Sequence, residues 1–347
     1  MIAVLAGATA AGKSRVALRF AREQREKGQI VEIVNADAMQ VYEGMDIGTA
    51  KASAAERADV PHHLLDVVTP DKPFNVADYV ARAETCIGDV LARGNVPVVV
   101  GGTGFYVRAL RQGLPTVPTA DMRVQAPLWE QFEREGIAVL EQRLASFSPA
   151  DATRAQKNPR RIIRALEIIE RTGKAPKDFP MTTPKFAYAL LALLPPADVL
   201  QARIAERVDA MFAAGLVDEV RELLVYYPDQ PTALQAIGYK EVVQYLRGEL
   251  SEPACREQVT LATWQYAKRQ RTWFRKEVRQ RGGDTEIAPT SASVTSAPVT
   301  PVPVTSAPVL SGEVLLARAA ISETADAEVQ RWLEYWAKPT SSHPDGR

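Results

Sequence analysis

A phosphate-binding loop at the start of the chain most limits what it can fold into. An apolar run, residues 2–6, is followed by Gly7-Ala8-Thr9-Ala10-Ala11-Gly12-Lys13-Ser14, which matches G-x-x-x-x-G-K-[ST] at every fixed position. Glycines let several backbone N–H groups converge on one centre, and a lysine and a following helix N-terminus add positive charge. Residues 15–27 read as that helix. The pattern predicts a strand–loop–helix unit that binds a di- or triphosphate, without identifying its carrier.

Two further loops are expected beside the first. A β-branched strand at 30–34 ends in Asn35-Ala36-Asp37, and an apolar strand at 96–100 ends in Gly101-Gly102-Thr103-Gly104. A strand–helix–strand unit places its strands parallel, and ligands bind at the C-terminal edge of such a sheet. We therefore expect Asp37 to lie beside the phosphate loop. The third loop lacks the aspartate that normally holds Mg²⁺ in phosphate-loop ATPases, which argues against an ordinary ATP hydrolase.

Composition allows one large domain with an insertion, or two domains. The 347 residues are 46% hydrophobic, and 42 basic side chains balance 42 acidic ones, so net charge does not indicate a partner. Cys86 and Cys255 form no disulfide or zinc pattern, which is consistent with a reducing, cytoplasmic environment. His62 and His63 point to opposite faces of a short strand, so we interpret them as structural. Because the given sequence begins with a strand that leads into the phosphate loop, we expect no signal peptide. No apolar run reaches the length needed to span a membrane.

Two basic helical segments favour a polyanionic partner. Residues 157–177 carry a net charge of +5, and residues 256–281 carry +6. Basic runs are usually solvated surface, but an electropositive face for nucleic acid is the sharper interpretation. Two sets of residues each share one helical face: Arg160, Arg161 and Arg164, and Lys268, Arg271 and Arg275.

The predicted fold is α/β, a parallel sheet of the P-loop NTPase type flanked by helices, with an all-helical insertion. The core comprises residues 1–114 and 185–282, and the insertion comprises 115–184, with helical patterns at 128–147 and 159–172. A long helical region at 196–226 places Arg203 and Arg207 one turn apart. In the basic C-terminal helix, Val259, Tyr266 and Trp273 recur every seven residues and are expected to face the core.

The end of the chain has a different composition. Residues 283–312 are rich in Ser, Thr and Pro and predict a linker that cannot bury a core. The tail, residues 313–347, predicts one or two amphipathic helices built on Leu315, Leu316, Val329, Leu333 and Trp336. Its role stays open.

Several motifs together resemble the tRNA dimethylallyltransferase (tRNA isopentenyltransferase) family over about residues 2–276. Besides the phosphate loop they are Asp37-x-x-Gln40-Val41-Tyr42 with Gly44-Met45-Asp46-Ile47-Gly48-Thr49-Ala50-Lys51, Gly101-Gly102-Thr103-Gly104, Asn158-Pro159-x-Arg161-x-x-Arg164-Ala165-Leu166-Glu167, Gln235-Ala236-Ile237-Gly238-Tyr239-Lys240, and Tyr266-Ala267-Lys268-Arg269-Gln270-x-Thr272-Trp273-Phe274-Arg275. The resemblance implies prenyl transfer from dimethylallyl diphosphate to N6 of the adenosine 3′-adjacent to the anticodon in tRNA. It also implies that the insertion grips the anticodon stem-loop. We expect a monomer that uses Mg²⁺.

The resemblance implies a role for individual residues. Asp37 would take the proton of the adenine amine, with Lys13, Arg207 and Thr103 completing the catalytic set. The diphosphate-binding residues would be Gly7, Thr9, Ala10, Ala11, Gly12, Lys13, Ser14 and Arg203, with Mg²⁺ at Ser14. The tRNA-binding residues would be Asp37, Ala38, Met39, Gln40, Thr103, Arg123, Arg160, Arg161, Arg164, Gln235, Gly238, Tyr239, Lys240, Lys268, Arg269 and Gln270.

Some positions depart from the family pattern, and other functions stay open. Ala8 stands where proline is frequent, Ala38 where serine is common and Arg160 where glutamine is usual, and an arginine is usual near Trp264. These changes bear on individual RNA contacts rather than on the reaction. The alternatives are a phosphate-loop kinase for a small metabolite, prenyl transfer to free adenine nucleotides, and a non-catalytic RNA-binding protein.

Overall fold

The computed structural model describes residues 1–230, 232–279, 286–287, 314–317, 329 and 331–335. The chain separates into two compact units. Unit 1 comprises Met1–Arg111 and Lys185–Arg347, and unit 2 comprises Gln112–Pro184. Unit 2 differs from the predicted insertion only at its first residues.

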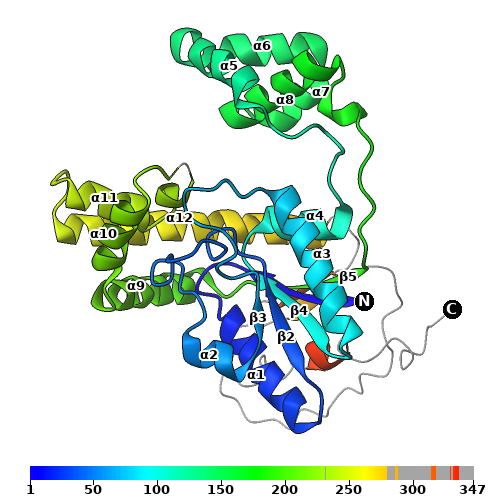
Figure 1. The fold of residues 1–347 in the computed structure, drawn as a ribbon, viewed down its shortest axis with the longest axis vertical. Helices are drawn as coiled ribbons and strands as arrows, with labels where there is room; N and C mark the ends of the chain where they lie inside the picture. The colour runs from blue at the N-terminus through cyan, green and yellow to red at the C-terminus, as the bar shows by residue number, and fades with distance from the viewer. Residues whose placement is uncertain (231, 280–285, 288–313, 318–328, 330, 336–347) are drawn as a thin grey trace, which may run out of the picture. The chain divides into compact units, whose positions relative to one another are not determined.

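Unit 1 is built on a parallel sheet, as the sequence predicts. Among the described residues, seven strands lie in the order β3-β2-β4-β1-β5-β7-β6, and every pairing between them is parallel; Figure 1 labels β2, β3, β4 and β5 of this sheet. Ala6 lies opposite Gly101, and Asn35 lies opposite Val100, so the loops after these three strands leave the sheet at one edge. The strands are β1 (Ile2–Gly7), β2 (Val31–Asn35), β3 (His62–His63), β4 (Val96–Gly101), β5 (Tyr188–Leu193), β6 (Glu286–Ile287) and β7 (Val314–Ala317).

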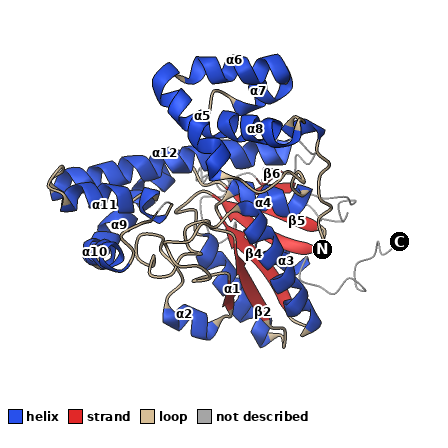
Figure 2. Ribbon diagram, turned by 45° about the horizontal axis from the view of Figure 1, so that its top comes forward, coloured by secondary structure: helices blue, strands red, loops and turns tan. Residues whose placement is uncertain are grey.

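Helices cover both faces of this sheet (Figure 2). Ala3 and Leu5 belong to one core with residues of α1, α9, α10 and α11. Val4 and Ala6 belong to a second core with residues of α3, α4 and the end of α12. Because both faces are covered, every residue of β1 is buried, which explains its unbroken apolar run. The helices of unit 1 are α1 (Lys13–Glu26), α2 (Ala54–Asp59), α3 (Val76–Ala92), α4 (Gly104–Gln112, ending in unit 2), α9 (Ala197–Ala213), α10 (Leu216–Tyr226), α11 (Tyr239–Leu246) and α12 (Glu252–Arg279), with the short 3₁₀ turn η2 (Ala233–Gln235).

Unit 2 is helical, with a core of its own. Leu140, Leu144 and Ile162 are fully buried within it. The carboxylate of Glu167 is also fully buried and pairs with Arg164 at 2.7 Å and with Arg171 at 3.0 Å. The helices are α5 (Met122–Glu135), α6 (Ile137–Phe147), α7 (Pro149–Ala155) and α8 (Pro159–Thr172), followed by the 3₁₀ turn η1 (Pro176–Asp178).

Glycines interrupt two regions that the sequence predicts as continuous helix. The pattern at 128–147 divides into α5 and α6 at Gly136, whose φ is 79°. The pattern at 196–226 divides into α9 and α10 at Gly215, whose φ is 98°. Glycine adopts positive φ at little cost and ends a helix there, while the apolar periodicity resumes beyond it.

The predicted core face of the basic helix is only partly correct. Val259 is buried, but Tyr266 and Trp273 are only partly buried. Ala267 and Phe274, one residue further along, are fully buried instead. A straight α-helix drifts relative to a seven-residue repeat, so the buried face moves along α12.

The tail contributes to unit 1 in a way that the sequence does not predict. Leu315 and Leu316 lie in β7, opposite Leu191 and Ala192 of β5, and not in a helix. Residues 331–335 are helical, and Val329 and Leu333 are buried in the core that contains α1. A four-residue strand is too short for periodicity to separate it from a helix. Trp336 and most of the predicted linker 283–312 lie outside the described residues.

Candidate active site

The phosphate loop has the backbone that its glycines predict. Gly7 and Gly12 have φ values of 147° and 88°. A Cβ at Gly7 would lie 2.3 Å from the carbonyl oxygen of Leu193 on the adjacent strand, so only glycine fits there. Lys13 begins α1, and its Nζ donates to the carbonyl oxygens of Gly7 at 3.2 Å and of Ala8 at 2.8 Å. The loop therefore closes around the lysine amine.

Two arginines of α9 bring further positive charge to this loop. A cavity of 460 Å³ is lined by both arginines and the start of α1. Arg207 donates to the carbonyl oxygen of Thr49 at 3.2 Å, whereas a buried guanidinium nitrogen of Arg203 has no hydrogen-bond partner among the described residues. Such an unsatisfied donor beside a phosphate loop fits a bound anion. The cavity is lined by Ala10, Gly12, Lys13, Ser14, Arg15, Ala50, Arg203, Glu206 and Arg207.

The surroundings of Lys13 perturb its protonation. Burial lowers the pKa of the Lys13 ammonium from 10.5 to about 8; the negative charge of Asp37 opposes this shift, and the positive charge of Arg207 adds to it. Burial also lowers the pKa of Arg207, and Asp37 again opposes the change. The charges of Asp37 and Arg207 therefore both influence the protonation of Lys13.

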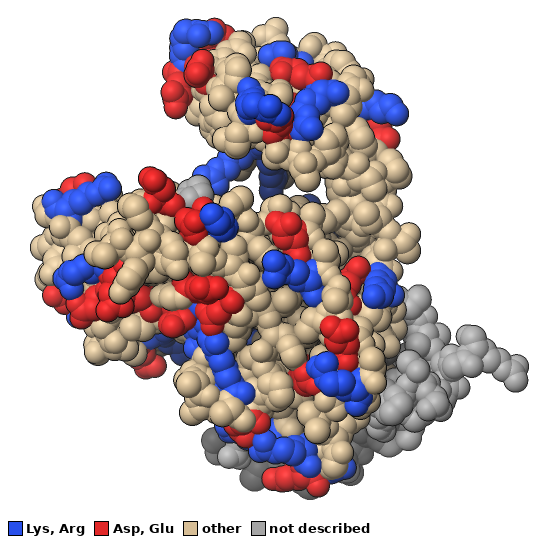
Figure 3. Space-filling model, in the orientation of Figure 1, with Lys and Arg blue, Asp and Glu red and all other residues tan. Residues whose placement is uncertain are grey.

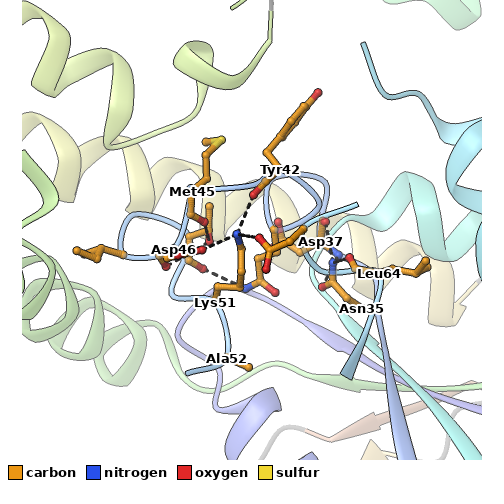
Figure 4. Close-up of polar contacts among 12 residues, drawn as sticks. Asn35, Asp37, Tyr42, Met45, Asp46, Lys51, Ala52 and Leu64 are labelled. Atoms are coloured by element: carbon orange, nitrogen blue, oxygen red, sulfur yellow. Dashed lines mark hydrogen bonds and ion pairs between the residues drawn. The ribbon is translucent and has the colours of Figure 1, made fainter. Parts of the chain in front are cut away.

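Asp37 is held in a defined position after β2. Its carboxylate accepts the backbone N–H of Met39 at 2.9 Å, and its own N–H donates to the Asn35 side chain at 3.1 Å. The Asn35 amide donates in turn to the carbonyl oxygens of Asp37 and Leu64, both at 3.1 Å (Figure 4). Local hydrogen bonds thus fix this carboxylate at the edge of the sheet.

The loop after β4 contacts the loop that carries Asp37. The Thr103 hydroxyl accepts the N–H of Ala38 at 2.9 Å, and the Thr103 N–H donates to the carbonyl oxygen of Ala36 at 3.1 Å. A Cβ at Gly101 would lie 2.1 Å from that same carbonyl oxygen, so the approach requires glycine. All three loops that the sequence places at this edge therefore meet.

The three loops line a second cavity of 330 Å³. It has Lys13 and Asp37 in its wall, together with apolar side chains such as Met211 and Ile237. This combination suits a ligand with an apolar part attached to a charged one. Its other lining residues include Thr9, Asn35, Gln40, Thr103, Arg207, Gln235, Tyr239, Thr263, Tyr266 and Gln270.

Comparison with known proteins identifies the family. A family model described as IPP transferase matches residues 40–277. The tRNA dimethylallyltransferase of Thermus thermophilus is 51% identical over 276 residues, covering 80% of this chain and 90% of the relative. This chain belongs to the IPP transferase family.

Solved structures of related enzymes share the fold. A full-length tRNA isopentenylpyrophosphate transferase from Bacillus halodurans is 30% identical, with a TM-score of 0.62 over 97% of this chain and 96% of that one. A eukaryotic dimethylallyltransferase, described as acting on tRNA, gives a TM-score of 0.63 at 30% identity over 79% of this chain and 69% of its own. The predicted family and fold class are therefore confirmed. No helix in the described part of this family member has the length and apolar character needed to cross a membrane.

A partly buried carboxylate that sequence reasoning missed holds a loop of this IPP transferase at the cavity. Glu219 of α10 accepts the backbone N–H groups of Asp46, Ile47 and Gly48 at 2.7 to 3.2 Å and the hydroxyl of Tyr239 at 2.6 Å. Burial, followed by the charge of Glu219, raises the pKa of Tyr239 well above its usual value. Nothing in the sequence around Glu219 signals this role, because the three backbone N–H groups that it accepts are 171 to 173 residues away.

A buried lysine fixes the other end of the same loop. The side chain of Lys51 is fully buried, and its Nζ donates to the Tyr42 carbonyl at 2.7 Å, to Asp46 at 2.6 Å and to Asp66 at 2.5 Å (Figure 4). Lys51 ends the glycine-containing motif that the sequence shows, but the motif does not indicate its partners. The loop that includes Thr49 and Ala50 is thereby held against the phosphate site.

The predicted RNA-contacting residues of unit 1 have different environments. Gln235, Gly238 and Tyr239 line the cavity of 330 Å³ that contains Asp37, while Lys240, Lys268 and Arg269 are exposed. Gln270 is buried and bonded within the protein. Arg271, predicted to share a basic face with Lys268, donates to the carbonyl oxygen of Pro195 at 2.7 Å.

In unit 2 the predicted basic face contains paired charges. Arg164 is held by buried Glu167, and Arg123 pairs with Asp121 at 2.9 Å. Arg160 and Arg161 are both exposed, and Arg161 contacts the side chain of Gln156 at 3.4 Å. On the face drawn in Figure 3, Lys and Arg side chains are interspersed with Asp and Glu side chains over this unit. Arg164 and Arg123 therefore each have an acidic partner within this unit.

Proposed function

We propose that this protein transfers the dimethylallyl group of dimethylallyl diphosphate to N6 of the adenosine 3′-adjacent to the anticodon in tRNA, releasing pyrophosphate. One observation carries the proposal: Asp37 shares a cavity with Lys13 and Arg207, in a protein whose relatives are named tRNA dimethylallyltransferase. A base therefore lies in the same cavity as cations suited to a diphosphate.

The chemistry follows from these groups. The N6 lone pair of adenine forms a bond to C1 of the prenyl group while the bond from C1 to the diphosphate oxygen breaks. The Asp37 carboxylate takes the N6 proton, because an exocyclic adenine amine is a weak nucleophile. Lys13, Arg203, Arg207 and the N–H groups of the phosphate loop stabilise the negative charge that grows on pyrophosphate.

Ser14 is the proposed protein ligand for Mg²⁺. It lies in the wall of the basic cavity, and the described residues contain no cluster of three His, Cys, Asp or Glu side chains that could hold a metal. Mg²⁺ commonly takes one or two protein ligands and completes its shell with substrate phosphates and water. A hydroxyl beside a diphosphate fits that pattern, and the ion would supply further neutralisation of the leaving group.

The tRNA is proposed to bind through its anticodon stem-loop. The target base must leave its stack to reach Asp37, as in other base-modifying enzymes. Tyr266 and Gln235 in the cavity wall and the exposed cations of α12 would receive the loop. We also propose that the enzyme acts in the cytoplasm as a monomer, which light scattering would test for the purified protein.

A phosphate-loop kinase is the alternative, and the structure does not favour it. β4 ends at Gly101 and continues into Gly102 and Thr103, so no carboxylate stands where such enzymes normally hold Mg²⁺. Prenyl transfer to free adenine nucleotides would not require the helical unit 2, which is predicted to bind tRNA.

The decisive assay mixes the protein with dimethylallyl diphosphate, Mg²⁺ and unmodified tRNA and measures prenylated adenosine by mass spectrometry. Wild type should form the product, and Asp37→Asn should slow a single turnover by about 10² to 10⁴. Asp71→Asn is the control, since that carboxylate pairs with its neighbour Lys72 at 2.9 Å. Absence of product with wild type, or full activity of Asp37→Asn, would refute the proposal.

A further inference from the structure

The side chain of Gln270 joins the two phosphate-side loops of the cavity. Its Oε1 accepts the backbone N–H of Thr9 at 2.8 Å, and its Nε2 donates to the carbonyl oxygen of Gly102 at 2.8 Å. The residue is 5% exposed. One partner is a donor and the other an acceptor, so the two partners determine the orientation of the carboxamide.

This bridge removes one N–H group from the set available to an anion. Thr9 lies within the phosphate loop, but its N–H is already satisfied by Gln270. A diphosphate would therefore be held by the amides after Thr9, by Lys13 and by the arginines of α9. The resemblance implies that Gln270 binds RNA. Because the side chain is buried and already makes two hydrogen bonds within the protein, it is poorly placed for that role.

Gln270 also links the phosphate loop to the helix that carries exposed cations. Lys268 and Arg269 precede it on α12 and are exposed, and Tyr266, one turn earlier, lines the cavity. The only side chain of α12 that bonds the phosphate loop, among the described residues, is Gln270. A shift of α12 would therefore move the phosphate loop, because this carboxamide links the two.

We propose that Gln270 is a positioning residue for the diphosphate and not an RNA contact. It holds the phosphate loop against the loop that carries Thr103, so that the leaving group is aligned with Asp37. The identity of the ligand as a diphosphate rests on the proposed function.

The test compares diphosphate binding with RNA binding in Gln270→Ala. We expect inorganic pyrophosphate to bind about tenfold more weakly by calorimetry, because two buried hydrogen bonds that shape its site are lost. The KM for dimethylallyl diphosphate should rise and kcat should fall, while the Kd for tRNA in a filter-binding assay stays unchanged. Gln258→Ala is the matched control, since Gln258 is an exposed residue of the same helix. Weaker tRNA binding with unchanged pyrophosphate binding would overturn the proposal.

A second variant tests the same bridge without removing Gln270. A Cβ at Gly102 would lie 2.5 Å from Nε2 of Gln270, so Gly102→Ala must displace the carboxamide. Gly102→Ala should reproduce the loss of pyrophosphate affinity. The variant that combines Gly102→Ala with Gln270→Ala should bind pyrophosphate no more weakly than Gln270→Ala alone, because both substitutions disrupt the same bridge. Fully additive losses would refute the bridge. A wild-type protein that binds pyrophosphate but forms no prenylated product would contradict the proposed function instead, leaving these binding results to decide the role of Gln270.

Discussion

Lys13 should titrate near pH 8 in the free enzyme, and diphosphate binding should take up protons there. Burial lowers the pKa of its ammonium to about 8. The negative charge of a bound diphosphate favours the protonated form and moves the pKa back upward. Without ligand, Lys13 is neutral in about half of the protein molecules at pH 8 and in about one tenth of them at pH 7. Binding should therefore take up about half a proton per molecule at pH 8 and about a tenth of a proton at pH 7.

The same titration sets the pH dependence of affinity. The protonated form binds the anion, and the neutral fraction grows as pH rises through 8. Affinity for dimethylallyl diphosphate should therefore fall about tenfold between pH 7 and pH 9, or about 1.4 kcal/mol. Calorimetry in two buffers of different ionisation enthalpy measures the protons taken up at each pH. Lys13→Met supplies the baseline, because it removes the amine while the ligand's own ionisation is unchanged.

Two substitutions should move this titration in opposite directions. Asp37→Asn removes the charge that opposes the shift, so it should lower the pKa of Lys13 further. Arg207→Gln removes a like charge, so it should raise that pKa and move the fall in affinity to a higher pH, although the loss of a cation weakens binding at every pH. Proton uptake at pH 8 no greater than in Lys13→Met, or shifts of the same sign in both variants, would refute the electrostatic account of this site.

Three substitutions test the scaffold, each by urea unfolding. Glu219→Gln should lower the free energy of unfolding by about 2–4 kcal/mol, because an amide cannot accept all four donors that the carboxylate accepts; an unchanged midpoint would contradict this. Lys51→Met should cost about 1–3 kcal/mol, because the hydrogen bonds of the buried amine to Tyr42, Asp46 and Asp66 are lost, although Asp46 is exposed and Asp66 keeps its pair with Arg57. A loss below about 1 kcal/mol would show that water replaces the amine. Leu333→Ala should cost about 2–5 kcal/mol, since the side chain is fully buried in the core of unit 1; unaltered stability would mean that the tail does not support the sheet.

The sequence was sufficient to predict which loops meet, because that follows from topology. Parallel strands deliver their C-terminal ends to one edge, so Gly7, Asp37 and Gly101 had to lie near one another once three strands were recognised. The one-turn spacing of Arg203 and Arg207 likewise predicted that both could face one neighbour, and both line the basic cavity. These inferences need only strand direction and helix geometry.

The side-chain contacts that hold these loops in place could not be predicted from strand direction and helix geometry. Gln270 bonds Thr9 across 261 residues, and neither residue shows in its own segment that it has a distant partner. Arg164 was expected on a basic face, but buried Glu167 neutralises it, and an (i, i+3) spacing does not show which partner is buried. Propensity and periodicity describe one element at a time, whereas these contacts depend on where several elements pack.

Side chains from the C-terminal part of unit 1 hold loops that lie near the N-terminus of the chain. Two distant side chains hold loops at the site: Gln270 of α12 holds the phosphate loop and Gly102, and Glu219 of α10 holds the loop at Asp46–Gly48. Helices of the C-terminal part of unit 1 therefore set the distance between the diphosphate site and Asp37. A phosphate loop placed in this way, with glycines rather than a carboxylate after β4, suits a leaving group that must be released from a fixed position beside the base. Substitutions in these helices should consequently alter the rate of prenyl transfer even where they contact neither substrate.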